Sequence, residues 1–327
     1  MKEMMWAYLI HLGSNMWNDA VGPDPVVSFG EGTLRRQLPV YHQEMLAERE
    51  IWRNTVDFAA VEGVNTLVID LGEGLQYESH PELAIPGAWT KDELRAELAR
   101  LRSMGITPIP KLNFSACHDA WLGEYRLMRC TDTYYRVRRE LIDEVCVLFD
   151  HPAYFQIGMD EENLACQRTM GIVTIRNEAQ WWKDFYMLVD DCERNGARAW
   201  CWSDYYWEHP DVFARRMPKS VLQSNWCYDE LKPKGPDGHY PNISYQAYID
   251  LDRLGYDQVP TASCWGYIHN IEQTVLLALH EKLDPERLYG FMAAPWVFTT
   301  ELNRYALMDN AHKLGLCRKN YEKRFRP

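Results

Sequence analysis

Short apolar runs recur along the whole chain and alternate with longer segments in which apolar residues return every three or four positions. The short runs are typical of buried strands, and the longer periodic segments are typical of amphipathic helices. The predicted strands are Met5–Leu12, Asn65–Leu71, Thr107–Asn113, Ala153–Gly158, Ala197–Ser203, Val221–Trp226, Val259–Cys264 and Gly290–Trp296.

Helical patterns fill most of the intervals between these strands. Thr90 followed by Glu93 has the spacing of a capping box, which predicts a helix start at this point. The stretch Lys232–Asn242 is rich in proline and glycine and is predicted to be a loop. The predicted helices are Gln43–Glu62, Thr90–Gly105, Tyr134–Phe149, Glu178–Asn195, Pro210–Arg216, Ile271–Glu281 and Glu301–Leu314.

The regular alternation of strand and helix decides the predicted fold. Strands separated by helices form a parallel sheet, and eight such units close into a barrel. No shift in composition marks a second domain. The pattern therefore predicts an α/β fold, a single-domain (β/α)8 TIM barrel over residues 1–327.

Composition narrows the classes of partner. The chain of 327 residues carries a net charge of -12, which argues against nucleic acid and anionic membranes. No apolar run approaches membrane-spanning length, and the N-terminus lacks the layout of a signal peptide. The nine cysteines are scattered without a Cys-x-x-Cys pair, as expected for small buried residues in a reducing compartment. These features predict a cytoplasmic protein.

Three acids in a row follow the fourth predicted strand. The run Ala153–Gly158 ends in glycine, and Asp160, Glu161 and Glu162 come directly after Met159. Neighbouring carboxylates repel one another, so a fold keeps them together where they are solvated or have a task. In α/β barrels the C-terminal ends of the strands carry the chemistry. Asp160 and Glu161 are therefore the predicted catalytic residues.

Acids and large aromatic residues also follow the other predicted strands, and together they would line one rim of a barrel. These rim residues include Asn15 and Trp17, then Asp70, Glu73, Gln76 and Tyr77, then Asn113, His118, Asp119 and Trp121, then Trp202, Asp204, Tyr205, Tyr206 and Trp207, then Trp226, Tyr228 and Asp229, then Trp265 and Tyr267, and finally Trp296 and Glu301.

Such a rim suits a carbohydrate. Aromatic rings pack on the C–H faces of sugars, while carboxylates and amides bind the hydroxyl groups. Any one tryptophan is more often a core residue, and any one acid is more often a helix N-cap. Tryptophan or tyrosine at nearly every strand end favours the sugar interpretation, so the predicted partner is a carbohydrate substrate.

Two segments resemble a known family. The motif Phe155-Gln156-Ile157-Gly158-Met159-Asp160-Glu161, after a helix containing Glu144-Val145 and ending in Leu148-Phe149, is similar to His-Ile-Gly-Gly-Asp-Glu of the family 20 glycoside hydrolases, the β-N-acetylhexosaminidases. Upstream, the segment from Gly105 to His118 resembles that family's Gly-Ile…Ile-Pro-Glu-Ile-Asp-x-Pro-Gly-His motif. The resemblance is specific over Trp89–Glu162.

The chain also departs from the family's motifs. Gln156 replaces a histidine and Met159 a glycine, while Lys111 and Asn113 replace two acids. The first predicted strand lacks the family's Asp-x-x-Arg pattern, and Leu12–Asn15 offers no cation in its place.

The resemblance implies a retaining glycosidase in which the 2-acetamido group of the sugar assists catalysis. It implies that Glu161 is the general acid and base and that Asp160 orients the acetamido group and stabilises the oxazolinium intermediate. His118 would support the carboxylates. No cofactor and no metal ion is expected. The predicted substrate-binding residues are His118, Asp70, Glu73, Asn113, Trp202, Asp204, Trp226, Tyr228, Asp229, Trp265, Trp296 and Glu301.

Two alternatives stay open on the same barrel. A metal-dependent sugar isomerase or epimerase would need acids and histidines that converge on one ion, and Asp70, Glu73, His118, Asp160 and Glu161 could supply them. A carbohydrate-binding barrel without catalytic activity is the second alternative, because a fold does not determine a function. A tightly held metal would indicate the isomerase, and turnover of aryl glycosides would exclude the binding protein. The sequence makes no prediction about the oligomeric state.

Overall fold

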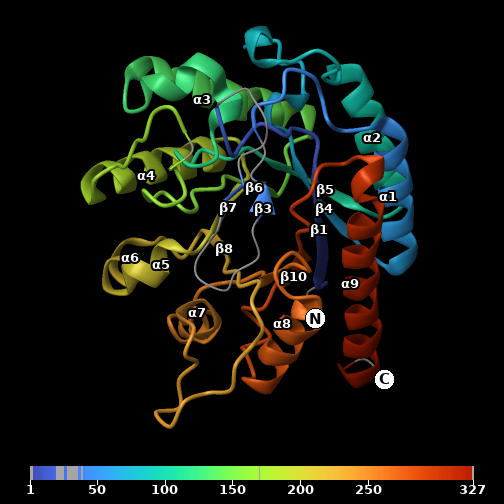
Figure 1. Cartoon of the computed structure of the whole chain (residues 1–327), viewed down its shortest axis with the longest axis vertical. Coiled ribbons are helices and arrows are strands. Elements are labelled where there is room, and N and C mark those ends of the chain that lie inside the picture. Colours follow the sequence, from blue (N-terminus) through green and yellow to red (C-terminus); the bar gives the residue numbers. More distant parts are fainter. Residues whose placement is uncertain (1–2, 20–25, 28–35, 38–39, 169, 326–327) are drawn as a thin grey trace.

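The computed structural model describes residues 3–19, 26–27, 36–37, 40–168 and 170–325. Eight parallel strands form one sheet in the order β8-β7-β6-β5-β4-β1-β10-β9 (Figure 1). Isolated parallel bridges from Gln223 to Gln258 and from Trp226 to Thr261 join the two ends of this sheet. The strands are β1 (Met5–His11), β4 (Thr66–Asp70), β5 (Thr107–Lys111), β6 (Tyr154–Gln156), β7 (Arg198–Trp202), β8 (Leu222–Ser224), β9 (Thr261–Ala262) and β10 (Gly290–Ala293).

Helices surround the strands and complete the barrel (Figure 1). The last helix lies beside the first, where Glu62 pairs with His312 and Lys319 at 2.9 Å each. The predicted (β/α)8 TIM barrel is confirmed. The helices are α1 (Arg49–Glu62), α2 (Lys91–Ser103), α3 (Asp132–Leu148), α4 (Glu178–Arg194), α5 (Tyr205–Glu208), α6 (Pro210–Arg216), α7 (Ile243–Arg253), α8 (Asn270–His280) and α9 (Arg304–Phe325).

Short elements complete the chain outside the barrel strands and the α-helices. They are the 3-10 helices η1 (Gly72–Gly74), η2 (Pro81–Leu83), η3 (Ala120–Met128) and η4 (Glu301–Asn303), and the antiparallel pair β2 (Val26–Val27) and β3 (Arg36–Gln37).

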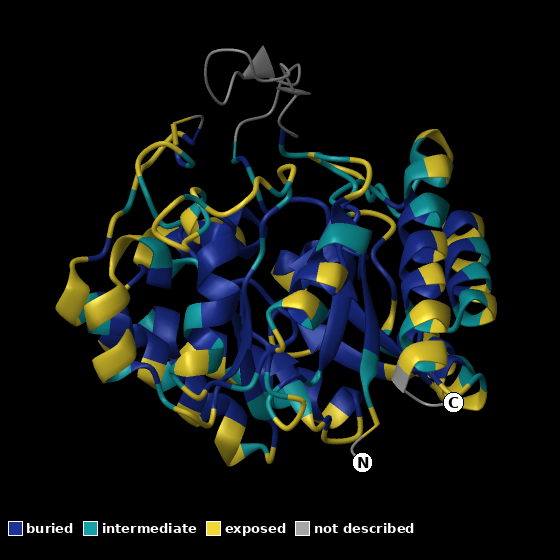
Figure 2. Cartoon of the chain, turned by 90° about the horizontal axis from the view of Figure 1, so that it is seen from below, coloured by how far each residue is buried: buried dark blue, intermediate teal, exposed yellow. Residues whose placement is uncertain are grey.

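Period-two alternation along the strands separates two apolar cores. On β1, Ala7 and Leu9 belong to the cluster inside the barrel, whereas Trp6, Tyr8 and Ile10 belong to the cluster between strands and helices. Burial follows this arrangement, since the strands are buried and the helices expose their outer faces (Figure 2). The same alternation directs the last residue of several strands into the mouth of the barrel.

The start of one predicted helix is confirmed, another helix starts later than predicted, and a further helix was not predicted. The capping box of Thr90 and Glu93 is present, with reciprocal hydrogen bonds of 3.2 and 2.9 Å. Helix α1 begins at Arg49 rather than Gln43, because the amides of Met45 and Glu48 bond to distant carbonyl groups instead. Helix α7 was not predicted; its N-cap, Asn242, accepts the amide of Ser244 at 3.0 Å.

Two further findings concern membrane-spanning helices and the cysteines. Among the described residues, no helix is long and apolar enough to cross a membrane. All nine cysteines lie in described segments, and all are free thiols.

Candidate active site

The chain leaves strand β6 through a left-handed turn that carries the acidic pair. Gly158, Met159 and Glu161 have positive φ angles of 72°, 75° and 55°. Such angles are costly for residues with a side chain and persist where the surroundings enforce them. A Cβ atom at Gly158 would lie 1.9 Å from Asn113 Oδ1, so only glycine fits at this position.

Side chains from both neighbouring strands hold this turn. From the β5 side, Asn113 Oδ1 accepts the amide of Met159 at 3.3 Å, and the Ser115 hydroxyl donates to the carbonyl of Asp160. From the β7 side, Asp204 Oδ2 accepts the amide of Glu161 at 2.8 Å. The turn is therefore fixed by residues that follow adjacent strands.

His118 connects the two acids. Its Nε2 atom lies 3.1 Å from Glu161 Oε2 and 3.3 Å from Asp160 Oδ2. Asn113 Nδ2 donates to the other oxygen of Asp160 at 2.9 Å. The structure thus brings together four residues that the sequence analysis assigned to one site.

The environment separates the two members of the acidic pair. The Asp160 side chain is 8% exposed, whereas the Glu161 side chain is 33% exposed. Burial alone would raise the pKa of Asp160, but the charge and hydrogen bond of His118 outweigh it and hold this pKa below the usual value. Burial would lower the pKa of His118, but Asp160 and then Glu161 raise it well above the usual value. Asp160 and His118 therefore form a charged pair.

Asp204 behaves differently from Asp160. Burial, followed by the negative charges of Asp160 and Glu161, raises the pKa of Asp204 to about 8. Its Oδ2 atom accepts the amide of Glu161, while its Oδ1 atom is buried without a hydrogen-bond partner. Near neutral pH this carboxyl is therefore largely protonated.

A buried charged group lies inside the barrel, next to the mouth. Lys111 Nζ lies 2.6 Å from Asp70 Oδ2, and His11 Nδ1 lies 3.3 Å from the same oxygen. Burial would raise the pKa of Asp70, but the charge of Lys111 outweighs it and lowers this pKa. Asp70, predicted to bind substrate, is thus paired with Lys111, which the sequence analysis noted only as a departure from the family motif.

Glu73 supports the loop that follows β1. Its Oε1 atom accepts the amides of Ser14 at 2.7 Å and Asn15 at 2.9 Å, while its Oε2 atom is buried without a partner. Burial raises the pKa of Glu73 more than these hydrogen bonds lower it. One oxygen of Glu73 is therefore occupied by the protein and the other is not.

An aromatic wall is formed by side chains at or after the ends of β7, β8 and β10. Trp296 packs against Trp202 with ring centroids 5.7 Å apart, against Tyr228 at 6.4 Å and against His11 at 5.6 Å. Tyr228 in turn stacks on Trp226 at 5.0 Å. The Nε1 atom of Trp202 is buried without a hydrogen-bond partner. Buried donors without a partner are uncommon in folded proteins, and a bound ligand would satisfy them.

The charges of Asp160 and Glu161 also affect the pKa of Tyr228. Burial raises its pKa well above the usual value; a hydrogen bond with the Trp296 side chain lowers this pKa, while the charges of Asp160 and Glu161 raise it. Its hydroxyl group therefore stays protonated and can donate a hydrogen bond at the mouth of the barrel.

Three predicted residues make none of these contacts. Glu301 is exposed and pairs with Arg304, 2.5 Å between Glu301 Oε2 and Arg304 Nη2. Asp229 is exposed, and its Oδ2 atom accepts from Asn242 at 3.4 Å. Trp265 is partly buried, and its amide donates to Ser263 Oγ at 3.0 Å. Their assignment to substrate binding stays a prediction.

The sequence did not lead us to assign His11 to the site, and it marked Gln156 only as a departure from the family motif. Both are buried; His11 Nε2 and Gln156 Nε2 have no hydrogen-bond partner. Counting in twos along each strand would have found them, because His11 follows the interior residues Ala7 and Leu9.

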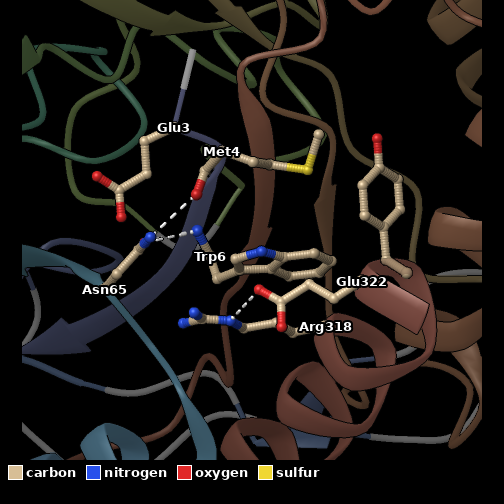
Figure 3. A pocket seen from close by; sticks show the side chains of 7 residues that line it. Glu3, Met4, Trp6, Asn65, Arg318 and Glu322 are labelled. Atoms are coloured by element: carbon tan, nitrogen blue, oxygen red, sulfur yellow. Dashed lines mark hydrogen bonds and ion pairs between the residues drawn. The ribbon is translucent and has the colours of Figure 1, made fainter. Parts of the chain in front are cut away.

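A small pocket lies at the opposite end of the barrel (Figure 3). It surrounds the start of β1, where the Trp6 amide donates to Asn65 Oδ1 at 2.8 Å and Arg318 pairs with Glu322 at 2.9 Å. In barrels of this class the N-terminal end serves stability and the C-terminal end serves chemistry. The candidate active site is therefore the cluster around Asp160 and Glu161.

Searches with the sequence find no matching protein-family model and no matching curated protein. Solved structures do share the fold. They include a chitobiase from Flavobacterium johnsoniae, with a TM-score of 0.60 and 18% identity over 85% of this chain and 48% of that one. A β-N-acetylhexosaminidase from Bacteroides fragilis has a TM-score of 0.62 and 14% identity, covering 95% of this chain and 65% of that one.

The N-acetyl-β-hexosaminidase from Streptomyces plicatus is similar to the same degree, with a TM-score of 0.61 and 13% identity over 96% of this chain and 64% of that one. The chain thus spans 48% to 65% of the length of these three structures. Its barrel has the fold of the family 20 glycoside hydrolases, which confirms the remote resemblance noted in the sequence.

Proposed function

We propose that this chain is a glycoside hydrolase that acts on terminal N-acetylhexosamine residues with retention of configuration. The observation that carries the proposal is the contact of His118 with both Asp160 and Glu161 at the end of β6. The β-N-acetylhexosaminidase fold of the barrel supports it.

Glu161 is the proposed general acid and base. Its side chain is one-third exposed, so it can reach the oxygen of a scissile bond, and His118 contacts the same carboxyl at 3.1 Å. A positioned carboxyl group protonates the leaving oxygen and then activates water in the second step.

Asp160 is proposed to act on the sugar's acetamido group. It is buried and ionised beside His118, and Asn113 fixes one of its oxygens. A fixed negative charge can orient the acetamido N–H and stabilise the positive oxazolinium intermediate. No water is needed as the nucleophile in the first step.

The aromatic wall is proposed to hold the sugar ring. Trp202 and Trp296 offer ring faces, Trp202 offers an N–H donor without a partner, and Tyr228 adds a hydroxyl donor. Ring faces cover the C–H groups of a sugar while the donors bind its oxygens.

A panel of nitrophenyl glycosides tests the proposal. We expect release of nitrophenol from β-N-acetylglucosaminide or β-N-acetylgalactosaminide, and less from glycosides with a free 2-hydroxyl. A lower rate of release in Glu161→Gln, with a larger loss on substrates that have poorer leaving groups, identifies the site, and Glu208→Gln, an exposed acid on α5, serves as the matched control. Binding of these sugars without any turnover would instead favour a carbohydrate-binding barrel.

One observation favours a second function. His118 and the two acids place one ligand atom each within 4.8 Å of one another, an arrangement that could hold a divalent ion. This arrangement would suit the metal-dependent isomerase. Elemental analysis of the purified protein, with turnover measured before and after chelation, separates the two functions. The hydrolase is unaffected by the chelator, whereas the isomerase loses its activity and regains it with metal.

A further inference from the structure

The last hydrogen bonds between β6 and β7 suggest a role for Asp204 other than binding a sugar hydroxyl. The hydrogen-bond ladder between these strands continues past the end of β6. The Ile157 amide donates to the Trp200 carbonyl at 2.8 Å, and the Trp202 amide donates to the Gly158 carbonyl at 3.1 Å. The backbone then turns left-handed and the ladder ends. At this point the side chain of Asp204 takes the place of a backbone acceptor and receives the amide of Glu161.

The conformation of Glu161 makes this contact important. Its φ of 55° is unfavourable for a residue with a side chain, by about 1–2 kcal/mol. The β5 side supports the same turn, where Asn113 accepts the amide of Met159 at 3.3 Å and the Ser115 hydroxyl donates to the carbonyl of Asp160. At Glu161 itself, the carbonyl accepts the amide of Asn163 at 2.6 Å, and the amide donates to the side chain of Asp204 at 2.8 Å. Asp204 is therefore the side chain that fixes the Glu161 amide.

Asp204 is itself held in place. Its neighbour Ser203 donates its amide to the Ser224 carbonyl of β8 at 3.1 Å, and the Trp207 amide bonds to the Asp204 carbonyl at 2.9 Å. The Asp204 backbone is thus anchored to β8 and to the start of α5. An anchored acceptor can fix the group that it binds.

We propose that Asp204 is a positioning residue that holds the backbone of Glu161, and with it the carboxyl group of Glu161, in the geometry needed for proton transfer. This inference rests on the proposed function for its catalytic readout. A displacement of about 1 Å of a catalytic group can cost about 10²-fold in rate. Asp204 acts through Glu161 and needs no contact with the sugar.

A pair of variants separates the hydrogen-bond acceptor from the ionisable carboxyl group. Asp204→Ala removes the acceptor, whereas Asp204→Asn keeps a carbonyl oxygen where the carboxyl group accepts the Glu161 amide. We expect Asp204→Ala to lower kcat by about 10- to 100-fold with KM within about threefold, and Asp204→Asn to recover part of this loss. A residue that binds a sugar hydroxyl would instead raise KM in both variants.

A double-mutant cycle with Glu161→Gln tests whether Asp204 acts through Glu161. In that background Asp204→Ala should lower kcat by less than about threefold, because the group that it positions no longer transfers a proton. An equal loss in both backgrounds would overturn the inference. Thermal unfolding of each variant identifies losses that come from a general loss of structure.

A second readout does not depend on turnover. Hydrogen exchange of the Glu161 amide, measured by fragmentation mass spectrometry, should become at least about tenfold faster in Asp204→Ala and stay close to the wild type in Asp204→Asn. Unchanged exchange in Asp204→Ala would refute the positioning role. If Glu161→Gln leaves turnover intact, the proposed function fails, and the exchange result still decides whether Asp204 positions this residue.

Discussion

The ammonium group of Lys111 lies 2.6 Å from the carboxylate of Asp70 inside the barrel, where both side chains are almost completely buried. Two opposite charges at this depth depend on each other, because water cannot stabilise either one alone. The pair lies in the layer of side chains directly below the mouth, together with His11.

The first prediction concerns this pair. Asp70→Asn leaves a buried lysine without a counter-charge and should lower the free energy of unfolding by about 3–5 kcal/mol. Adding Lys111→Met should recover most of the loss, because both charges are then removed. Urea denaturation of the single and double variants measures the difference. A single-variant cost under about 1 kcal/mol would contradict the prediction.

The second prediction concerns the general acid. Glu161→Gln keeps the size of the side chain but cannot deliver a proton, so turnover of glycosides with poor leaving groups should fall by about 10²–10⁴. Nitrophenyl glycosides need less protonation and should lose less. Steady-state kinetics on both substrate classes measures this contrast, and equal losses on both would argue against Glu161 as the acid.

The third prediction separates the role of Asp160 from that of Glu161. Asp160→Asn removes the negative charge proposed to stabilise the oxazolinium ion. It should therefore reduce turnover of acetamido sugars more than that of sugars with a free 2-hydroxyl. The ratio of kcat/KM for the two classes measures the effect. If that ratio does not change, acetamido assistance is the wrong mechanism.

The fourth prediction concerns the turn after β6. Gly158 has a φ of +72°, and a Cβ there would meet Asn113 Oδ1 at 1.9 Å. Gly196 has a φ of +78° with no atom within 4 Å of such a Cβ, so it is a matched control. Gly196→Ala should cost about 1–2 kcal/mol in unfolding free energy for its backbone alone. Gly158→Ala should cost more than about 3 kcal/mol, because the clash adds to the backbone term.

Thermal and urea unfolding compare these two glycine variants. Equal costs would mean that Asn113 moves aside without loss. In that case turnover should still fall in Gly158→Ala alone, since Asn113 also holds Asp160.

The fifth prediction is a pH dependence of stability caused by Asp204. Its pKa is about 8 in the folded protein, against 3.8 for an ordinary aspartate. Between these values the folded protein holds a proton that the unfolded chain has released, so this carboxyl lowers stability as pH rises from about 4 to 8. The charged groups that act on Asp204 are Asp160 and Glu161. His118 contacts Asp160 at 3.3 Å, and burial together with the charge of Asp204 raises the pKa of the Cys201 thiol.

Asp204→Asn removes this titration. The difference in unfolding free energy between Asp204→Asn and the wild type should therefore shift in favour of the variant from pH 5 to pH 8 and level off above pH 8. Denaturant titrations at several pH values measure it. A difference that stays constant over this range would show that the carboxyl does not titrate there.

The barrel could be predicted from the sequence because its signals are local. Each strand is an apolar run of its own, and the acids after β6 lie next to the strand that positions them. The pairing of Lys111 with Asp70 is different, because it depends on register between strands, in which His11, Asp70 and Lys111 are successive partners. That register joins residues far apart in the chain and leaves no mark in any single segment.

Local competition explains why Glu301 lies apart from the other candidates. It follows the last strand, as a rim residue should, but Arg304 lies one helical turn later and pairs with it. Helix α7 escaped prediction because a polar loop rich in proline and glycine precedes it. In both cases a neighbour a few residues away decided the structure.

The left-handed turn after β6 limits how this site could be transplanted. The backbone that carries Asp160 and Glu161 needs a glycine at position 158. It also needs the side-chain amide of Asn113 and the hydroxyl of Ser115, which follow β5, and the carboxyl of Asp204, which follows β7. An engineer who copied the acidic motif alone into another barrel would place two carboxylates on an unsupported loop. The unit that can be transferred is three adjacent strand ends, with their register.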